Sequence, residues 1–207
     1  MTEDEFVGLV GEALVHVTPA SNVPSILRAG LLRPATLARL AGRDPAELAL
    51  RRNPVVLAFP GGDAVLNHQR PLRAGRAADF LEGVSLERWA LMLDERLFFW
   101  PGTASERFLG SVEAREPSRV LHLDARGMFR AFGGVLDLAP INTGSATRKP
   151  VRRGSWIYTP ALGSVQAFRE ARRARGLVQG RDAVAEVSLR ADVPPALLAS
   201  LLLGSVG

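Results

Sequence analysis

The chain has 207 residues, of which 47% are hydrophobic and 23% are charged. This composition excludes a disordered tail or a low-complexity polymer and supplies enough apolar residues for one buried core. Cysteine is absent, which excludes disulfides, thiolate nucleophiles and cysteine-based metal sites.

The positive charge is concentrated in one part of the chain. Lys and Arg number 26 against 21 Asp and Glu, a formal net charge of +5, and Lys149 is the single lysine. Residues 140–181, which we call the basic segment, hold nine basic residues and one acidic residue, so they carry +8 while the rest of the chain carries −3. Such a cluster favours an anionic ligand, and a solvated surface is the alternative.

The first residues are acidic, and no run approaches the roughly 18 apolar residues of a membrane span. Together with the lack of cysteine, this predicts a cytoplasmic protein without membrane contact.

In the first half of the chain, residues 14–18 alternate as a strand and end at Pro19. A helix capped by Ser21 or Asn22 follows, with Val23, Ile26 and Leu27 on one face and Gly30 as its stop. Further predicted elements are short helices opening at Pro34 and Pro45, a buried strand at 55–59, a helix capped by Ser85, and a strand at 96–100.

In the second half, strands are predicted at 119–123, 156–159 and 183–189, with loop across most of 139–163. Helices are predicted at 125–132, at 166–175 and from Pro195. The uneven order of helices and strands favours a single α+β domain over residues 1–207 rather than a doubly wound sheet.

Common nucleotide-binding and hydrolase motifs are missing. There is no G-x-G-x-x-G after a strand, no G-x-x-x-x-G-K-[ST], no H-E-x-x-H and no G-x-S-x-G. The three histidines lie far apart in sequence without a second ligand at helical spacing, so no metal site is predicted.

Polar residues instead stand at strand ends. His16 and Thr18 alternate on the first strand, so their side chains share a face and can line a cleft. The alternative is a buried histidine bonded to the backbone beside a turn threonine.

The stretch with His16, Thr18, Asn22 and the helix ending at Gly30 resembles the opening of the ADP-ribosyltransferase fold. The similarity is to the DarT-type enzymes, which modify DNA bases, and to a related uncharacterised bacterial family. In these proteins the His-x-Thr motif contacts NAD.

Two later segments extend the resemblance in the same order. Residues 95–100, followed by Arg107, are similar to the aromatic strand and arginine-bearing loop of that group. Residues 185–189 and the following Val193 and Pro194 resemble the strand that presents the catalytic glutamate.

The resemblance implies a split β-sheet core with short flanking helices and NAD as co-substrate, without a metal. It implies Glu186 as the catalytic residue. It implies His16, Thr18 and Arg107 for NAD binding. The predicted set is completed by Asn22 from the resembling stretch, by Arg96 for the pyrophosphate and by Phe99 for stacking, with a core position as the alternative for Phe99.

The chemistry of ADP-ribose transfer fits these residue types. Breaking the bond between nicotinamide and ribose passes through a cationic state that a carboxylate stabilises, for which Glu186 is the candidate. A solvent-facing glutamate on an edge strand is the alternative. Arginine suits the NAD pyrophosphate, although Arg96 has Asp94 and Glu95 as alternative partners.

In the basic segment, Arg148, Lys149, Arg152 and Arg153 precede Trp156 and Tyr158. Basic side chains interleaved with aromatic ones hold phosphates and stack bases, so these four residues are predicted to bind DNA or RNA. The alternatives are the NAD phosphates or no ligand. In the same segment, Asn142 and Thr143 are predicted either to face the cleft or to form a plain turn.

The predicted function is an NAD-dependent ADP-ribosyltransferase that modifies nucleic acid, with a protein inhibitor or antitoxin as a further partner. One alternative is an inactive nucleic-acid-binding module of the same fold. Others are transfer to a protein or small molecule, or the chemistry of the RNA 2′-phosphotransferase branch. The enzymatic prediction requires His16 and Glu186 to converge on one cleft.

Overall fold

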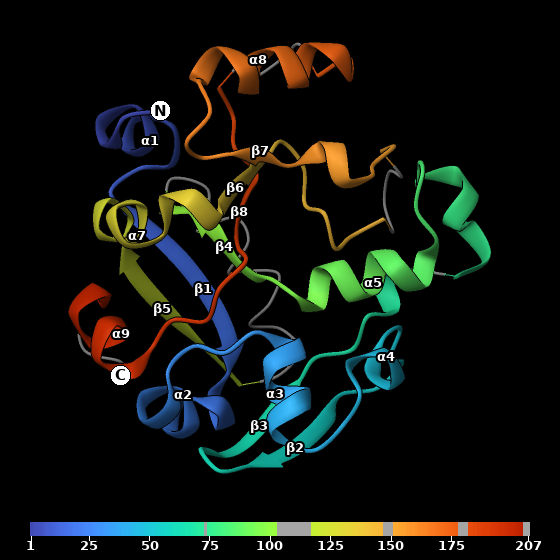
Figure 1. The fold of residues 1–207 in the computed structure, drawn as a ribbon, viewed down its shortest axis with the longest axis vertical. Coiled ribbons are helices and arrows are strands. Elements are labelled where there is room, and N and C mark those ends of the chain that lie inside the picture. The colour runs from blue at the N-terminus through green and yellow to red at the C-terminus, as the bar shows by residue number, and fades with distance from the viewer. Residues whose placement is uncertain (73, 103–116, 147–150, 178–181, 205–207) are drawn as a thin grey trace.

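A computed structural model of the protein describes residues 1–72, 74–102, 117–146, 151–177 and 182–204. Helices and strands alternate irregularly along the chain, which confirms the predicted α+β class (Figure 1). The α-helices are α1 (Glu3–Val10), α2 (Val23–Ala29), α3 (Pro34–Leu40), α4 (Pro45–Leu48), α5 (Leu86–Asp94), α7 (Ala125–Phe132), α8 (Val165–Ala174) and α9 (Pro195–Leu201). The strands are β1 (Ala13–Pro19), β2 (Val55–Phe59), β3 (Gly62–Leu66), β4 (Leu97–Pro101), β5 (Ser118–Asp124), β6 (Leu136–Ala139), β7 (Thr159–Pro160) and β8 (Glu186–Leu189).

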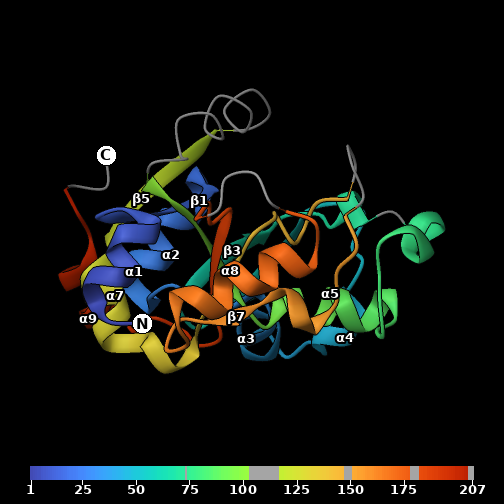
Figure 2. The ribbon, with the colours of Figure 1, turned by 90° about the horizontal axis from the view of Figure 1, so that it is seen from above.

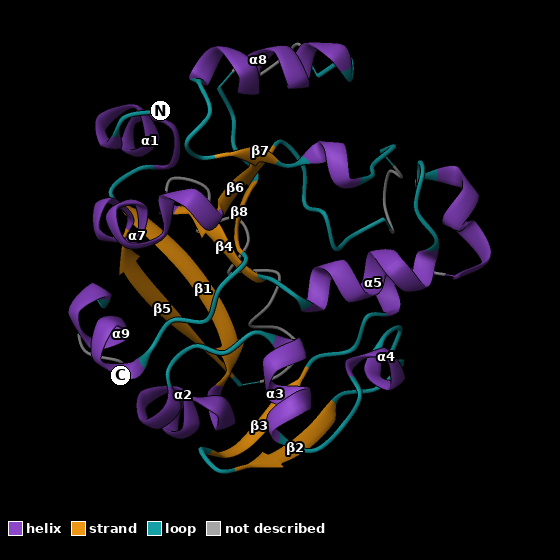
Figure 3. Ribbon diagram, in the orientation of Figure 1, coloured by secondary structure: helices purple, strands orange, loops and turns teal. Residues whose placement is uncertain are grey.

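Six of the strands within the described residues form one antiparallel sheet in the order β5-β1-β4-β8-β6-β7. Strands β2 and β3 form a separate hairpin, which lies with α2 and α3 at one end of the molecule, opposite α8 (Figure 3). Short 3-10 helices link several elements: Ala20–Asn22, Arg70–Leu72, Ala74–Asp79, Gly133–Val135 and Ser155–Ile157.

The two faces of the sheet are covered by different helices. On one face, α1, α7 and α9 pack against Leu14, Phe99 and Val187, and the three helices lie along the same side of the molecule in both views (Figures 1 and 2). On the other face, α5 packs with Phe98 and Tyr158. Strand β8 is therefore buried on both sides, which positions Glu186 inside the protein.

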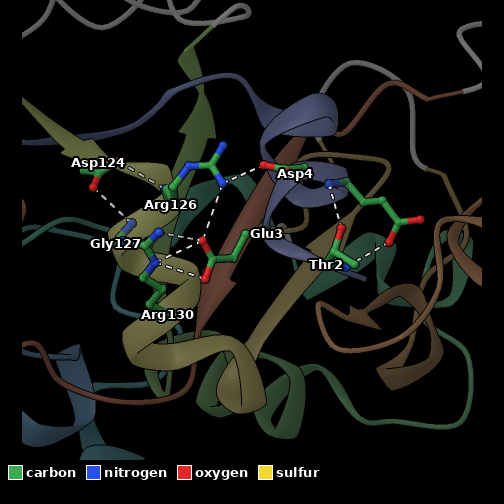
Figure 4. A network of polar contacts seen from close by, with 8 residues as sticks. Thr2, Glu3, Asp4, Asp124, Arg126, Gly127 and Arg130 are labelled. Carbon is green, nitrogen blue, oxygen red and sulfur yellow. Dashed lines mark hydrogen bonds and ion pairs between the residues drawn. The ribbon is translucent and has the colours of Figure 1, made fainter.

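Helices α1 and α7 are also joined by charged side chains (Figure 4). Arg126 donates to Asp4 at 2.7 Å, and Arg130 lies 2.9 Å from a carboxylate oxygen of Glu3. Solvent screens these pairs, and the apolar packing of Phe6 on Phe129 contributes more to the contact.

Gly30 ends α2 as predicted, and the structure adds a second reason for this residue. Its φ is +89°, and a Cβ atom there would lie 2.1 Å from the carbonyl oxygen of Val193. Leu31 then pairs with Val193 in an isolated bridge. The close approach holds α2 against the segment that follows β8.

Several predicted elements need correction. Leu27 is 52% exposed, so the buried side of α2 is formed by Ser25 and Ile26. The strand at 55–59 is not buried on both of its faces. Val56 is 66% exposed, because β2 belongs to a two-stranded hairpin that packs against the protein with one face only. Residues 155–157 form a 3-10 helix rather than part of the predicted strand, and β7 begins at Thr159.

Within the described residues, no helix has both the length and the apolar character needed to cross a bilayer.

Candidate ligand cavity and the Glu186 cluster

A cavity of about 230 Å³ lies where β1 separates from β4, between these strands, the start of α2 and α3, and the β2–β3 hairpin. Its walls are mainly apolar. The polar or aromatic residues among those that line it are His16, Thr18, Asn22, Ser25, Arg51, Phe59, Asn67, Arg96, Phe98 and Trp100.

His16 lies in the gap between the two strands. Strands β1 and β4 pair only at Leu14 with Pro101 and at Val15 with Trp100. At the next position, Nδ1 of His16 is 2.9 Å from the carbonyl oxygen of Phe98. A carbonyl only accepts, so Nδ1 carries the proton, and burial lowers the pKa of the ring. The neutral imidazole therefore presents Nε2 as an acceptor.

Asn22 attaches the turn after β1 to the hairpin. Its side-chain amide donates to the carbonyl of Val65 at 3.0 Å and to Oγ1 of Thr18 at 3.2 Å, and the Val65 amide donates to its Oδ1 at 2.7 Å. These bonds position Thr18 at the cavity. They also occupy the polar atoms through which Asn22 is predicted to contact NAD.

We expect Asn22→Ala to lower the free energy of unfolding by about 2 kcal/mol, because the backbone groups of Val65 lose their partners. Urea denaturation measures this loss. Asn67→Ala is the matched control, since Asn67 is exposed. Equal losses in the two variants would contradict a positioning role for Asn22.

Two other predicted NAD ligands lie differently from expectation. The guanidinium of Arg96 donates to Asp137 at 2.5 Å and Ser188 at 3.1 Å, so its ion-pair partner is neither Asp94 nor Glu95. Phe99 is fully buried and does not line the cavity, which corrects its predicted role. Side chains alternate along β4, and its neighbours Phe98 and Trp100 line the cavity instead. Arg107 lies outside the described residues.

Glu186 is the first residue of β8 and is 2% exposed. Because β8 lies between β4 and β6, the alternative of a solvent-facing glutamate on an edge strand is wrong. Its carboxylate accepts hydrogen bonds from the hydroxyl and the backbone amide of Thr143. Burial raises the pKa of Glu186 to about 7, although Thr143, Arg153 and Arg96 counteract the shift.

Arg153 holds the loop that carries Thr143. It is 1% exposed, and its Nη1 donates to the carbonyls of Asn142, Thr143 and Ser145 at 3.0, 2.9 and 2.9 Å. The prediction that Arg153 contacts nucleic acid is therefore wrong. Its donors instead satisfy carbonyls of the loop at residues 142–145.

His16 and Glu186 do not meet in one cavity in this structure. The ring of His16 lies 5.6 Å from that of Phe99. Phe99 pairs with Val187, so the adjacent Glu186 points to the opposite face, toward the side of Phe98 and Trp100. Only β4 separates the two residues, and Trp100 of that strand lines the cavity.

A buried ion pair behind the cavity has no signal in the sequence. Arg51 lines the cavity and donates to both oxygens of Asp94 at 2.6 and 3.1 Å. Gln69 also donates to Asp94 at 2.9 Å, and burial raises the pKa of this carboxyl. The partners are 43 residues apart, so only the fold brings them together.

Much of the basic segment is paired within the protein. Arg152 bonds to Glu82 at 3.1 Å, Arg169 bonds to Asp182 at 2.5 Å, and the buried Arg172 donates to the carbonyl of Ala183. Arg175 is exposed and lies 3.1 Å over the ring of Trp156. Arg148 and Lys149 lie outside the described residues.

The described residues contain no cluster of three or more histidine, aspartate or glutamate side chains able to hold a metal ion.

The model of DUF7002, a family of unknown function, matches residues 12–199. The chain belongs to this family. The match includes His16, Glu186 and all the described strands of this DUF7002 protein, so the cavity and the Glu186 cluster both lie within the family region. No curated protein matches the chain.

Proposed function

We propose that this DUF7002 protein is an NAD-dependent ADP-ribosyltransferase whose NAD site is the cavity between β1 and β4. One observation carries the proposal. Four of the six residues predicted to bind NAD, His16, Thr18, Asn22 and Arg96, line this cavity although they span 80 positions. At about 230 Å³ the cavity suits one ring and its sugar rather than the whole dinucleotide.

The chain's own residues supply the chemistry as follows. Nε2 of neutral His16 accepts a hydrogen bond from a ribose hydroxyl, and Trp100 or Phe98 offers a ring for stacking. The convergence of His16 and Glu186 that the enzymatic prediction requires is not present in this structure, so transfer requires a movement near Trp100 that opens the carboxylate of Glu186 to the cavity. A pKa of about 7 keeps a large fraction of this carboxyl ionised at neutral pH, where it stabilises the cationic state and accepts a proton.

We propose nucleic acid as the acceptor, bound by the exposed part of the basic segment. Arg152 is exposed and its pair with Glu82 is a surface pair, which anionic phosphates displace at little cost. Arg175 and Trp156 add a cation and a ring beside it. Transfer to a protein or small molecule is the alternative, and an inhibitor protein is a further proposed partner.

A second candidate function is a ligand-binding module without catalysis. The hydrogen bonds from Thr143 to the buried carboxylate of Glu186, and the absence of Glu186 from the cavity wall, favour it.

Calorimetry with NAD, followed by nicotinamide release with DNA or RNA present, tests the proposal. We expect NAD to bind, and we expect His16→Ala to weaken binding about tenfold because one buried hydrogen bond is lost. His122→Ala is the matched control, since His122 is exposed on β5. Absence of NAD binding contradicts the proposal, and binding without nicotinamide release supports the second candidate.

A further inference from the structure

A second cavity, of about 270 Å³, is lined by six residues, four of which are arginines. The six residues belong to α5 and the residue after it, to the residues just before α3 and β4, and to the residue after β8. We call it the arginine cavity, lined by Arg33, Arg88, Met92, Glu95, Arg96 and Arg190. It shares Arg96 with the cavity that we propose for NAD and is otherwise separate from it.

Three of the four guanidinium groups are fixed in place by carboxylates. Arg33 donates to both oxygens of Asp192 at 3.0 and 3.1 Å. Arg96 and Arg190 donate to the same oxygen of Asp137 at 2.5 and 3.0 Å. Fixed planar donors lose little conformational freedom when they bind an oxyanion, so this arrangement is preorganised for one.

The fourth guanidinium is available. Within the described residues, the side chain of Arg88 forms no hydrogen bond or ion pair, and its backbone amide donates to the cap residue Ser85. Asp137 balances one of the two arginines that it binds, and Asp192 balances Arg33. Two of the four arginine charges therefore remain without a compensating aspartate. Glu95, which also lies 3.7 Å from Arg39, offsets one of them. The cavity keeps a net positive charge.

We propose that the arginine cavity binds the phosphate group of a small molecule. A phosphate offers several acceptor oxygens and up to two negative charges, which match Arg88 and the exposed side of Arg190. The volume admits a phosphate with a small organic part rather than a polymer. Phosphate binding in this cavity requires neither NAD nor Glu186, so it is independent of the proposed transferase activity.

Titration with inorganic phosphate, followed by calorimetry or by phosphorus NMR, tests the proposal. We expect saturable binding that weakens about tenfold in Arg88→Gln, because one charged hydrogen-bond donor is lost. Glu95→Gln is expected to tighten binding severalfold, because it removes the one carboxylate on the wall. Both side chains are exposed, so neither change removes core packing. Arg173→Gln is the matched control for charge, since it changes an exposed arginine on α8.

The outcomes separate the alternatives. Absence of saturable binding, or an equal loss in Arg88→Gln and Arg173→Gln, overturns the proposal. Tighter binding of adenosine monophosphate than of inorganic phosphate identifies an organic ester as the ligand, and equal binding identifies the free ion. Phosphate binding that persists where NAD does not bind supports this inference while contradicting the transferase proposal.

Discussion

Replacing Glu186 by glutamine is expected to abolish nicotinamide release and, at the same time, to stabilise the domain above pH 7. Glutamine keeps the shape and an oxygen that accepts from Thr143, but it carries no charge to stabilise a cationic ribose. We expect at least a hundredfold loss of rate in this variant. Full activity would exclude Glu186 as the catalytic residue.

The stability effect follows from the sign of the pKa shift. The pKa of Glu186 is raised from 4.5 to about 7 in the folded protein, so the folded state holds its proton more strongly than the unfolded state. The free energy of unfolding therefore falls as pH rises from about 4.5 to about 7, by about 3 kcal/mol, and is flat above that range. The glutamine variant lacks this decrease.

Thermal unfolding of both proteins between pH 4 and pH 8 measures the difference. Glu87→Gln is the matched control, because Glu87 is exposed on α5. If Glu186 acts ionised, activity rises with pH across the same range in which stability falls. A wild-type stability profile that matches that of Glu186→Gln would show that Glu186 ionises normally.

Arg153→Ala is expected to lower the free energy of unfolding by about 3–5 kcal/mol, because three buried or partly buried carbonyls lose a donor and a large buried side chain is removed. For a chain of this length this corresponds to a fall in Tm of roughly 6 to 20 °C. Arg152→Ala, at the adjacent exposed position, is expected to cost less than about 1 kcal/mol.

The same pair of variants also separates structure from nucleic-acid binding. Arg152→Ala is expected to weaken DNA or RNA binding with little loss of stability. Arg153→Lys is expected to destabilise the domain, because one ammonium cannot replace both Nη1 and Nε, which donates to the carbonyl of Val151 at 3.0 Å. Removing the Arg153 charge also raises the pKa of Glu186 further, since Arg153 lowers it. If Arg152 and Arg153 prove equally tolerant of substitution, the loop is not held as described.

Much of the secondary structure is predictable because it depends on local signals. Ser85 caps a helix and Pro45 opens one where predicted, and α7 covers the predicted residues, since caps and apolar spacing act within one or two turns. Strand β6 is missed because its four residues are all buried, including Asp137. An aspartate between two leucines indicates an exposed position unless the distant Arg96 and Arg190 are known to bind it.

The candidate site shows the same limit. Residue types and their alternation alone place His16 and Thr18 on one strand and Glu186 within another, and they show that the positive charge is concentrated in one segment. The burial of Arg153 next to the exposed Arg152, and the bond from Thr143 to Glu186 across 43 residues of sequence, follow from the tertiary structure. Residue type and spacing set the direction of a side chain, whereas its burial and its partners depend on which other segments pack against it.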